Sequence, residues 1–208
     1  MKRWTAMRKL IWSRAVLGAA GGGLPSGYKR VIGFKFNDNA YYEIEGLKLK
    51  GSDTVKASFS VTAACNVFGC YTTADADNNY SLYASTASSA KYLRYDGGTY
   101  SSHFPSSALG EKLDVTITPT GSSGMPTDST WTQKDFTAST DLCIGTSSTS
   151  ATSAKMKGNF YGVFEVVGRF YGIPCERESD GALGYYDTKS KTFYEPTVGE
   201  PESLGYEV

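Results

Sequence analysis

Short runs in which apolar and polar residues alternate, each closed by a turn sequence, constrain this chain more than any other feature. Successive side chains of a strand point to opposite faces, so such a run buries one face and exposes the other. After residue 24 the clearest runs are residues 41–45, 55–61, 112–118 and 161–167. Residues that favour turns lie between the runs, at 25–27, 37–39, 96–98 and 121–124. The pattern predicts an all-β fold, an antiparallel β-sandwich.

The chain has 208 residues, which is enough for one all-β domain with a sizeable core. We therefore expect a single domain over residues 24–208, preceded by a separate N-terminal segment, residues 1–23. Lys plus Arg and Asp plus Glu number 21 each. Because no overall charge favours nucleic acid or an anionic membrane, we expect neither as a partner.

The charges are unevenly distributed along the chain. Residues 1–23 carry five cations and no acid, whereas four glutamates follow Lys191. Opposite charge at the two ends either steers assembly on a partner or a neighbouring copy, or reflects two ordinary solvated termini.

Residues 1–23 have the pattern of a short amphipathic arm. Apolar residues recur there at helical spacing, and a glycine-rich tether, residues 18–23, follows them. A short lone helix is marginal in water and needs a surface to pack on. We predict a helical or extended arm that anchors the protein to another chain through Trp4, Met7, Arg8, Leu10 and Ile11. The alternatives are a helix folded against its own domain and a disordered leader.

The arm superficially resembles a signal peptide, because a charged start precedes an apolar stretch. Arg14 interrupts the apolar run of residues 10–17, and nothing approaches the roughly 20 apolar residues of a membrane span. We expect an unprocessed protein that is made in the cytoplasm and is not secreted.

Four cysteines, Cys65, Cys70, Cys143 and Cys175, are too sparse for a disulfide-rich scaffold, so free thiols are the favoured state. A hairpin disulfide between Cys65 and Cys70 is the alternative. A zinc site needs a second closely spaced pair, which Cys143 and Cys175 do not supply.

Several spaced motifs resemble those of one family. Residues 24–28 read LPSGY, residues 66–70 read NVFGC and residues 191–194 read KTFY. The longest motif, residues 169–187, reads RFYGIPCERESDGALGYYD. Together these motifs resemble laminin-G-like and concanavalin-like jelly-roll modules found in proteins of gut bacteria and their phages, phage structural proteins included.

The resemblance implies a concanavalin-like jelly roll and a structural role in a phage particle. Within the longest motif, residues 179–181 predict a hairpin turn between a strand that ends near Cys175 and a strand over residues 182–187. Residues 31–39 depart from the opening motif of the family. If that strand helps to form a ligand surface in relatives, the resemblance implies the fold of this chain but not the ligand.

Two groups of residues are candidates for catalysis. Glu43 and Glu45 share a face if their segment is a strand, and paired carboxylates are the arrangement of a glycosidase. No third acid follows them, so a solvent-facing pair on an edge strand is favoured over hydrolysis. His103 is the only histidine and the chain has no Gly-x-Ser-x-Gly motif, which favours a histidine in a surface loop. We therefore predict that the protein is not an enzyme.

Two further groups are candidates for binding. Residues 75–79 have side-chain oxygens that could bind Ca²⁺, the one candidate cofactor. They lack the glycine and the terminal glutamate of an EF-hand loop, so an ordinary polar turn is the favoured interpretation. Tyrosines between positions 80 and 100 are candidates for stacking on sugars, but tyrosine is also ordinary strand material. The candidate glycan-contact residues are Tyr80, Tyr83, Tyr92 and Tyr95.

The hypothesis that unites these features is a virion structural protein of a phage that infects gut bacteria. In this hypothesis the arm binds other virion proteins of the capsid or tail, and a lectin-like jelly roll projects as a fibre, spike or decoration. Exposed strand edges also favour a homo-oligomer. The alternative is a carbohydrate-binding adhesion module that recognises host-surface glycans.

Overall fold

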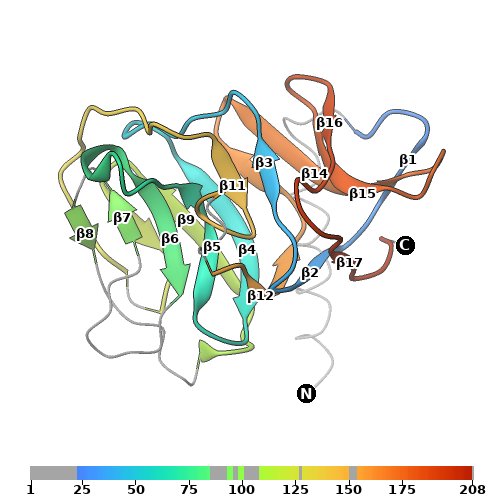
Figure 1. Cartoon of the computed structure of the whole chain (residues 1–208), viewed down its shortest axis with the longest axis horizontal. Coiled ribbons are helices and arrows are strands. Elements are labelled where there is room, and N and C mark those ends of the chain that lie inside the picture. Colours follow the sequence, from blue (N-terminus) through green and yellow to red (C-terminus); the bar gives the residue numbers. More distant parts are fainter. Residues whose placement is uncertain are drawn as a thin grey trace, which may run out of the picture.

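The computed structural model describes residues 23–84, 93–95, 98–100, 108–126, 128–149 and 154–207. These residues form an all-β fold of two antiparallel sheets, which lie one behind the other in Figure 1. The arm, with Trp4, Met7, Arg8, Leu10 and Ile11, lies outside the described residues, and so does His103.

The larger sheet contains most of the described strands. Along its main path the order is β16-β15-β14-β13-β4-β12-β2-β17, with β1 paired to β14, β9 paired to β4, and β10 paired to β9. The strands are β1 Tyr28–Arg30, β2 Gly33–Asn37, β4 Val55–Val61, β9 Leu113–Thr118, β10 Gly121–Ser123, β12 Lys157–Tyr161, β13 Phe164–Val166, β14 Phe170–Arg177, β15 Leu183–Asp187, β16 Thr192–Tyr194 and β17 Glu202–Ser203.

The smaller sheet has the order β3-β11-β5-β6-β7-β8. A short 3-10 helix, η1 (Ala76–Asn78), precedes β6. The strands are β3 Tyr42–Ile44, β5 Cys65–Cys70, β6 Tyr80–Ala84, β7 Leu93–Tyr95, β8 Gly98–Tyr100 and β11 Leu142–Ile144.

Aromatic side chains from both sheets fill the space between them. The ring centroids of Phe34 on β2 and Tyr42 on β3 are 5.5 Å apart, and those of Phe68 on β5 and Phe164 on β13 are 5.2 Å apart. All four side chains are buried. Because both sheets contribute one apolar face to the same core, the domain is a β-sandwich, as the alternating runs predict.

The structure confirms several of the predicted elements. The run 55–61 is β4, and residues 178–182 connect β14 to β15, with Gly181 at φ +76° in the turn. Glycine suits that position because a side chain makes a positive φ unfavourable. Two predictions were wrong in part. Residues 121–124 are mostly strand β10, and the run 161–167 is interrupted after Tyr161.

Candidate functional site

The outer face of the larger sheet carries a hollow of about 400 Å³, called here the first hollow. Its floor comes from neighbouring strands whose registers place polar side chains side by side. Lys56 on β4 is opposite Thr116 on β9 and Glu165 on β13, and Glu165 is opposite Tyr171 on β14. A row of four polar side chains therefore crosses four strands on one face.

An irregularity between β12 and β13 shapes this hollow. Phe160 pairs with Phe59, and Glu165 pairs with Lys56. The segment that joins β12 to β13 therefore advances five residues while β4 advances three. The two extra residues lie at 161–163, where Gly162 adopts φ +60°. Such bulges bend a strand and redirect side chains, and here Tyr161 and Val163 line the first hollow.

Hydrogen bonds hold the Tyr161 side chain in place. Its Oη lies 3.1 Å from Ser60 Oγ and accepts a hydrogen bond from Asn159 Nδ2 at 2.9 Å. The Lys112 Nζ atom lies 5.4 Å from the centre of the Tyr161 ring. A ring fixed in this way presents a defined aromatic surface without a further loss of side-chain entropy on binding.

The charged groups of the first hollow are paired with one another or with their neighbours. Lys56 Nζ lies 3.1 Å from Glu165 Oε2, and Arg30 Nε lies 3.2 Å from Glu207 Oε2. Asp114 likewise lies 3.7 Å from Lys112. The hollow therefore combines many polar atoms with little net charge.

Two polar atoms of the residues that line the first hollow, Arg30 Nε and Ser58 Oγ, are buried without a hydrogen-bond partner among the described residues, and Arg30 Nε has only its ion pair with Glu207. Ser58 faces the hollow from β4, opposite Asp114 on β9. A buried hydroxyl without a partner costs about 1–3 kcal/mol. A ligand hydroxyl recovers that free energy when the neighbouring side chains shift, because solvent does not reach Ser58 Oγ in this structure.

A second hollow, of about 410 Å³, lies on the same face of the larger sheet. Polar side chains of β2 and β12 line it, Lys35 and Asn37 from the first strand and Lys157 and Asn159 from the second. Both lysines are engaged, since Lys35 Nζ lies 2.9 Å from Glu202 and Lys157 Nζ lies 2.9 Å from Asp38. This hollow is therefore also polar and close to neutral.

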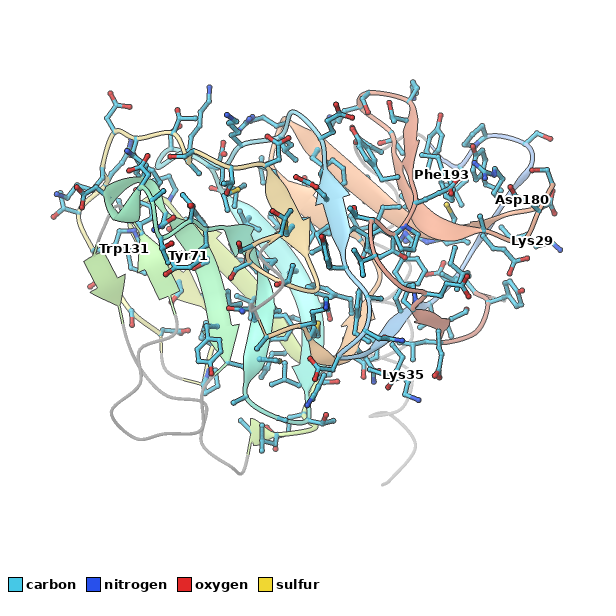
Figure 2. All side chains as sticks on the ribbon, in the orientation of Figure 1. Lys29, Lys35, Tyr71, Trp131, Asp180 and Phe193 are labelled. Carbon is cyan, nitrogen blue, oxygen red and sulfur yellow. The ribbon has the colours of Figure 1, made fainter. Side chains whose placement is uncertain are left out.

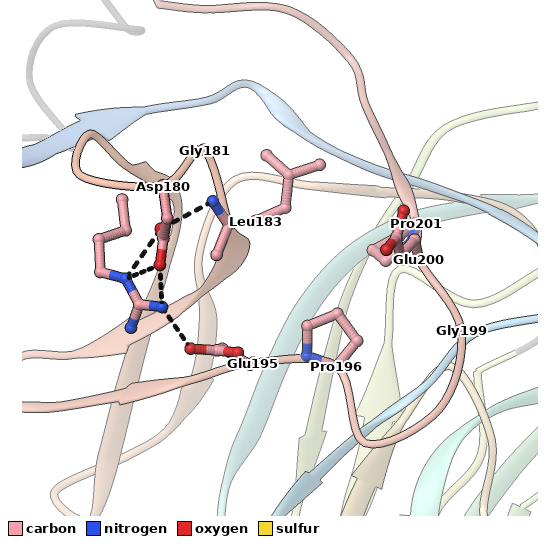
Figure 3. A pocket seen from close by; sticks show the side chains of 10 residues that line it. Asp180, Gly181, Leu183, Glu195, Pro196, Gly199, Glu200 and Pro201 are labelled. Atoms are coloured by element: carbon pink, nitrogen blue, oxygen red, sulfur yellow. Dashed lines mark hydrogen bonds and ion pairs between the residues drawn. The ribbon is translucent and has the colours of Figure 1, made fainter.

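A third cavity, of about 520 Å³, lies near the chain's acidic end (Figure 3). Arg177 donates to Asp180 and Glu195, each at 2.6 Å, and lies over the ring of Phe193 at 4.9 Å. These contacts tie the turn after β14 to the residue that follows β16. Figure 2 shows Asp180 and Phe193 on this end of the molecule. The charged side chains at this end of the cavity are therefore paired with one another.

Two of the four candidate glycan-contact tyrosines are in the core, so that assignment was wrong for them. Tyr80 and Tyr95 are both fully buried. Tyr95 Oη donates to Gly51 O at 2.6 Å, and its ring packs edge-on against Phe136. The alternation of β6 and β7 directs both rings inward, whereas Tyr83 is half-buried on the opposite face of β6. Tyr92 lies outside the described residues.

The carboxylates proposed as an edge-strand pair are not both on the strand. Glu43 is on β3, but Glu45 follows the end of β3 in a turn. Asp141 comes close to them and accepts a hydrogen bond from Gly46 N at 2.8 Å. Burial, followed by the charges of Asp141 and Glu45, raises the pKa of Glu43. Only the pairing of β3 with β11 brings this third acid near, so the local sequence gives no sign of it.

All four cysteines are free and buried. Cys65 and Cys70 are at opposite ends of the strand β5, so their Cα atoms are roughly 15 Å apart, whereas a disulfide requires about 4–7 Å. The hairpin disulfide is therefore excluded. Burial raises the pKa of the Cys65 thiol to about 11 and that of the Cys70 thiol to about 12.

The segment considered for Ca²⁺ contains η1. Asp75 accepts hydrogen bonds from Ser139 Oγ and, at 3.0 Å, from Asn78 Nδ2. These hydrogen bonds lower the pKa of Asp75. Among the described residues, no group of three or more His, Cys, Asp or Glu side chains is arranged to hold a metal ion. No helix in the described ranges is long and apolar enough to cross a membrane.

No protein-family model, curated protein or solved structure matches this chain.

The sequence analysis did not identify the residues that line the two hollows of the larger sheet. Period two places Lys56, Ser58 and Ser60 on one polar face of their strand, but it does not say which strands lie beside it. Gly162, a glycine inside the apolar run 161–167, is the sequence feature that could have indicated a bulge.

Proposed function

We propose that this chain is a phage virion structural protein that displays a saccharide-binding, concanavalin-like jelly roll and is held to the particle by residues 1–23. The resemblance of the motif at residues 169–187 supports the virion setting and the jelly-roll topology. The first hollow supports saccharide binding, and the observation that carries this part of the proposal is that the hollow combines two tyrosines, Tyr161 and Tyr171, with the buried, unpartnered hydroxyl of Ser58.

A neutral saccharide fits the chemistry of the first hollow. Sugar hydroxyls both donate and accept hydrogen bonds, which matches Ser58, Thr116 and the Lys56–Glu165 pair. The apolar face of a sugar ring packs against an aromatic ring, and Tyr161 and Tyr171 supply two. Because the charged groups are already paired, an anionic ligand gains little from them.

The proposed role is binding without hydrolysis. The hollow has two carboxylates, and each is paired with a lysine, Glu165 with Lys56 at 3.1 Å and Asp114 with Lys112 at 3.7 Å. A retaining glycosidase uses two carboxyl groups about 5–5.5 Å apart across the scissile bond. Chromatography of a bound oligosaccharide after prolonged incubation tests this point, and the appearance of shorter products that Glu165→Gln abolishes would contradict it.

A glycan array and direct titration test saccharide binding. We expect the wild-type protein to bind neutral glycans, and Tyr171→Ala and Ser58→Ala to weaken that binding about tenfold, which corresponds to about 1.4 kcal/mol. Tyr83→Ala is the matched control, because Tyr83 lies on the smaller sheet. Binding that survives both variants, or that only Tyr83→Ala removes, would place the site elsewhere.

Copurification with intact phage particles tests the virion role. Full-length protein is expected to incorporate, and protein lacking residues 1–23 is expected not to, as read by mass spectrometry and electron microscopy. Failure of both forms to associate with particles refutes the virion role and leaves an adhesion module alone, provided that the glycan array is positive.

A further inference from the structure

The two hollows on the outer face of the larger sheet are connected by one hydrogen-bonded group of side chains. Asn159 lines the second hollow and donates its Nδ2 hydrogen to Tyr161 Oη, which lines the first. Both residues belong to β12 and, two positions apart, they face the same side of the sheet. No described strand separates the two hollows.

The strand β4 gives the distance that a ligand must span to reach both hollows. Lys56 lines the first hollow, and Thr62, just after the end of the strand, lines the second. Six residues of extended chain span roughly 20 Å. A monosaccharide does not reach across that distance, whereas a short linear oligosaccharide does.

The second hollow repeats the polar chemistry of the first without its tyrosines, and Phe36, which also lines it, packs its ring against Phe160 in the core. Two lysines, each paired with a carboxylate, and the two asparagine side chains offer donors and acceptors in fixed positions. Asn37 Nδ2 donates to Glu202 Oε1 at 2.7 Å, which holds its amide oriented. Neutral polar groups that are already positioned favour a ligand rich in hydroxyl groups and with little charge.

We propose that the two hollows are subsites of one extended groove, which binds a linear neutral oligosaccharide with the Tyr161 side chain at the junction of the subsites. The inference rests on the proposed saccharide binding and adds the ligand's form, a linear chain rather than a terminal sugar. The aromatic first hollow supplies the main affinity, and the second hollow recognises the continuation of the chain.

A length series of oligosaccharides tests the proposal. Size-fractionated oligomers of a neutral β-glucan and a neutral α-mannan, from a single sugar to about six, are titrated calorimetrically against the full-length protein. We expect affinity to rise about tenfold or more between the short and the long members of the bound series and then to level off, because the ligand gains contacts until both subsites are filled.

Variants of the second hollow separate this proposal from saccharide binding itself. Lys157→Ala and Asn37→Ala should reduce the affinity for the long oligomers to that of the short ones and leave the short ones unchanged. Lys29→Ala is the matched control, since Lys29 is an exposed lysine that, like Lys157, pairs with a carboxylate, that of Glu178, but lines neither hollow.

The possible failures are distinguishable. Equal affinity for short and long oligomers, or equal loss for both in the second-hollow variants, overturns the extended groove while saccharide binding stands. Absence of binding by every oligomer overturns the saccharide function, and the extended groove with it.

Discussion

Asp187 provides the sharpest test of how the groove is held in shape. The side chain is 2% exposed and accepts three backbone hydrogen bonds, from Tyr171 N at 2.8 Å, Lys189 N at 3.1 Å and Ser190 N at 2.9 Å. It thus fixes both the turn after β15 and the backbone of β14 at Tyr171, a residue of the first hollow. We predict that Asp187→Ala destabilises the domain and also weakens saccharide binding.

The magnitude follows from those three hydrogen bonds. A hydrogen bond to a charged group contributes about 1.5–3 kcal/mol, but the turn N–H groups of Lys189 and Ser190 regain water when the carboxylate is removed. The expected loss is therefore about 3–4 kcal/mol rather than the full sum. For a domain of this size that loss lowers Tm by roughly 6–16 °C. Asp187→Asn keeps one acceptor oxygen and should lose about half as much.

Urea denaturation followed by circular dichroism measures this loss, with Glu111→Ala as an exposed control for which no change is expected.

The stability that Asp187 provides should also depend on pH. Burial acts to raise the pKa of Asp187, but its hydrogen bonds, of which that from Tyr171 N is the largest contribution, lower the pKa overall. A lowered folded pKa means that the stabilisation is complete above the ordinary carboxyl pKa of about 4 and is lost as the pH falls through the folded value. A loss under about 1 kcal/mol at pH 7, or a difference between wild type and variant that grows on acidification, would refute this reasoning.

Three further predictions concern stability and reactivity. Arg169→Ala leaves the buried Asp53 carboxylate without its ion-pair partner and should cost about 3 kcal/mol in urea denaturation, with Arg169→Lys recovering part of the loss. Gly69→Ala should cost at least about 3 kcal/mol or prevent folding, because the added Cβ would lie 2.5 Å from Ser81 Cβ at φ +155°; a soluble variant with wild-type Tm contradicts this. The buried cysteines should react with a thiol reagent at pH 8 only after denaturation, since burial raises the pKa of Cys70 to about 12, and rapid labelling of the native protein would argue against the buried positions.

Local patterns predicted a useful part of the fold. The run 55–61 coincides with β4, and the turn after β14 is where residues 179–181 indicate it. The same patterns failed for Tyr80 and Tyr95, because an aromatic residue in an alternating run suits either face until the partner sheet is known. Asp141 was missed beside Glu43 because only the pairing of β3 with β11 joins them.

By itself, the sequence determined that this chain forms strands and where many of them turn. Period-two alternation and residues such as Gly181, which tolerates a positive φ, act over a few neighbouring positions, so they can be read locally. Only the tertiary structure decided which strands are neighbours. Lys56, Glu165 and Tyr171 become one row through the pairing of β4, β13 and β14, and the bulge before β13 adds Tyr161. The groove is therefore a property of non-local pairing, which depends on how the whole core packs.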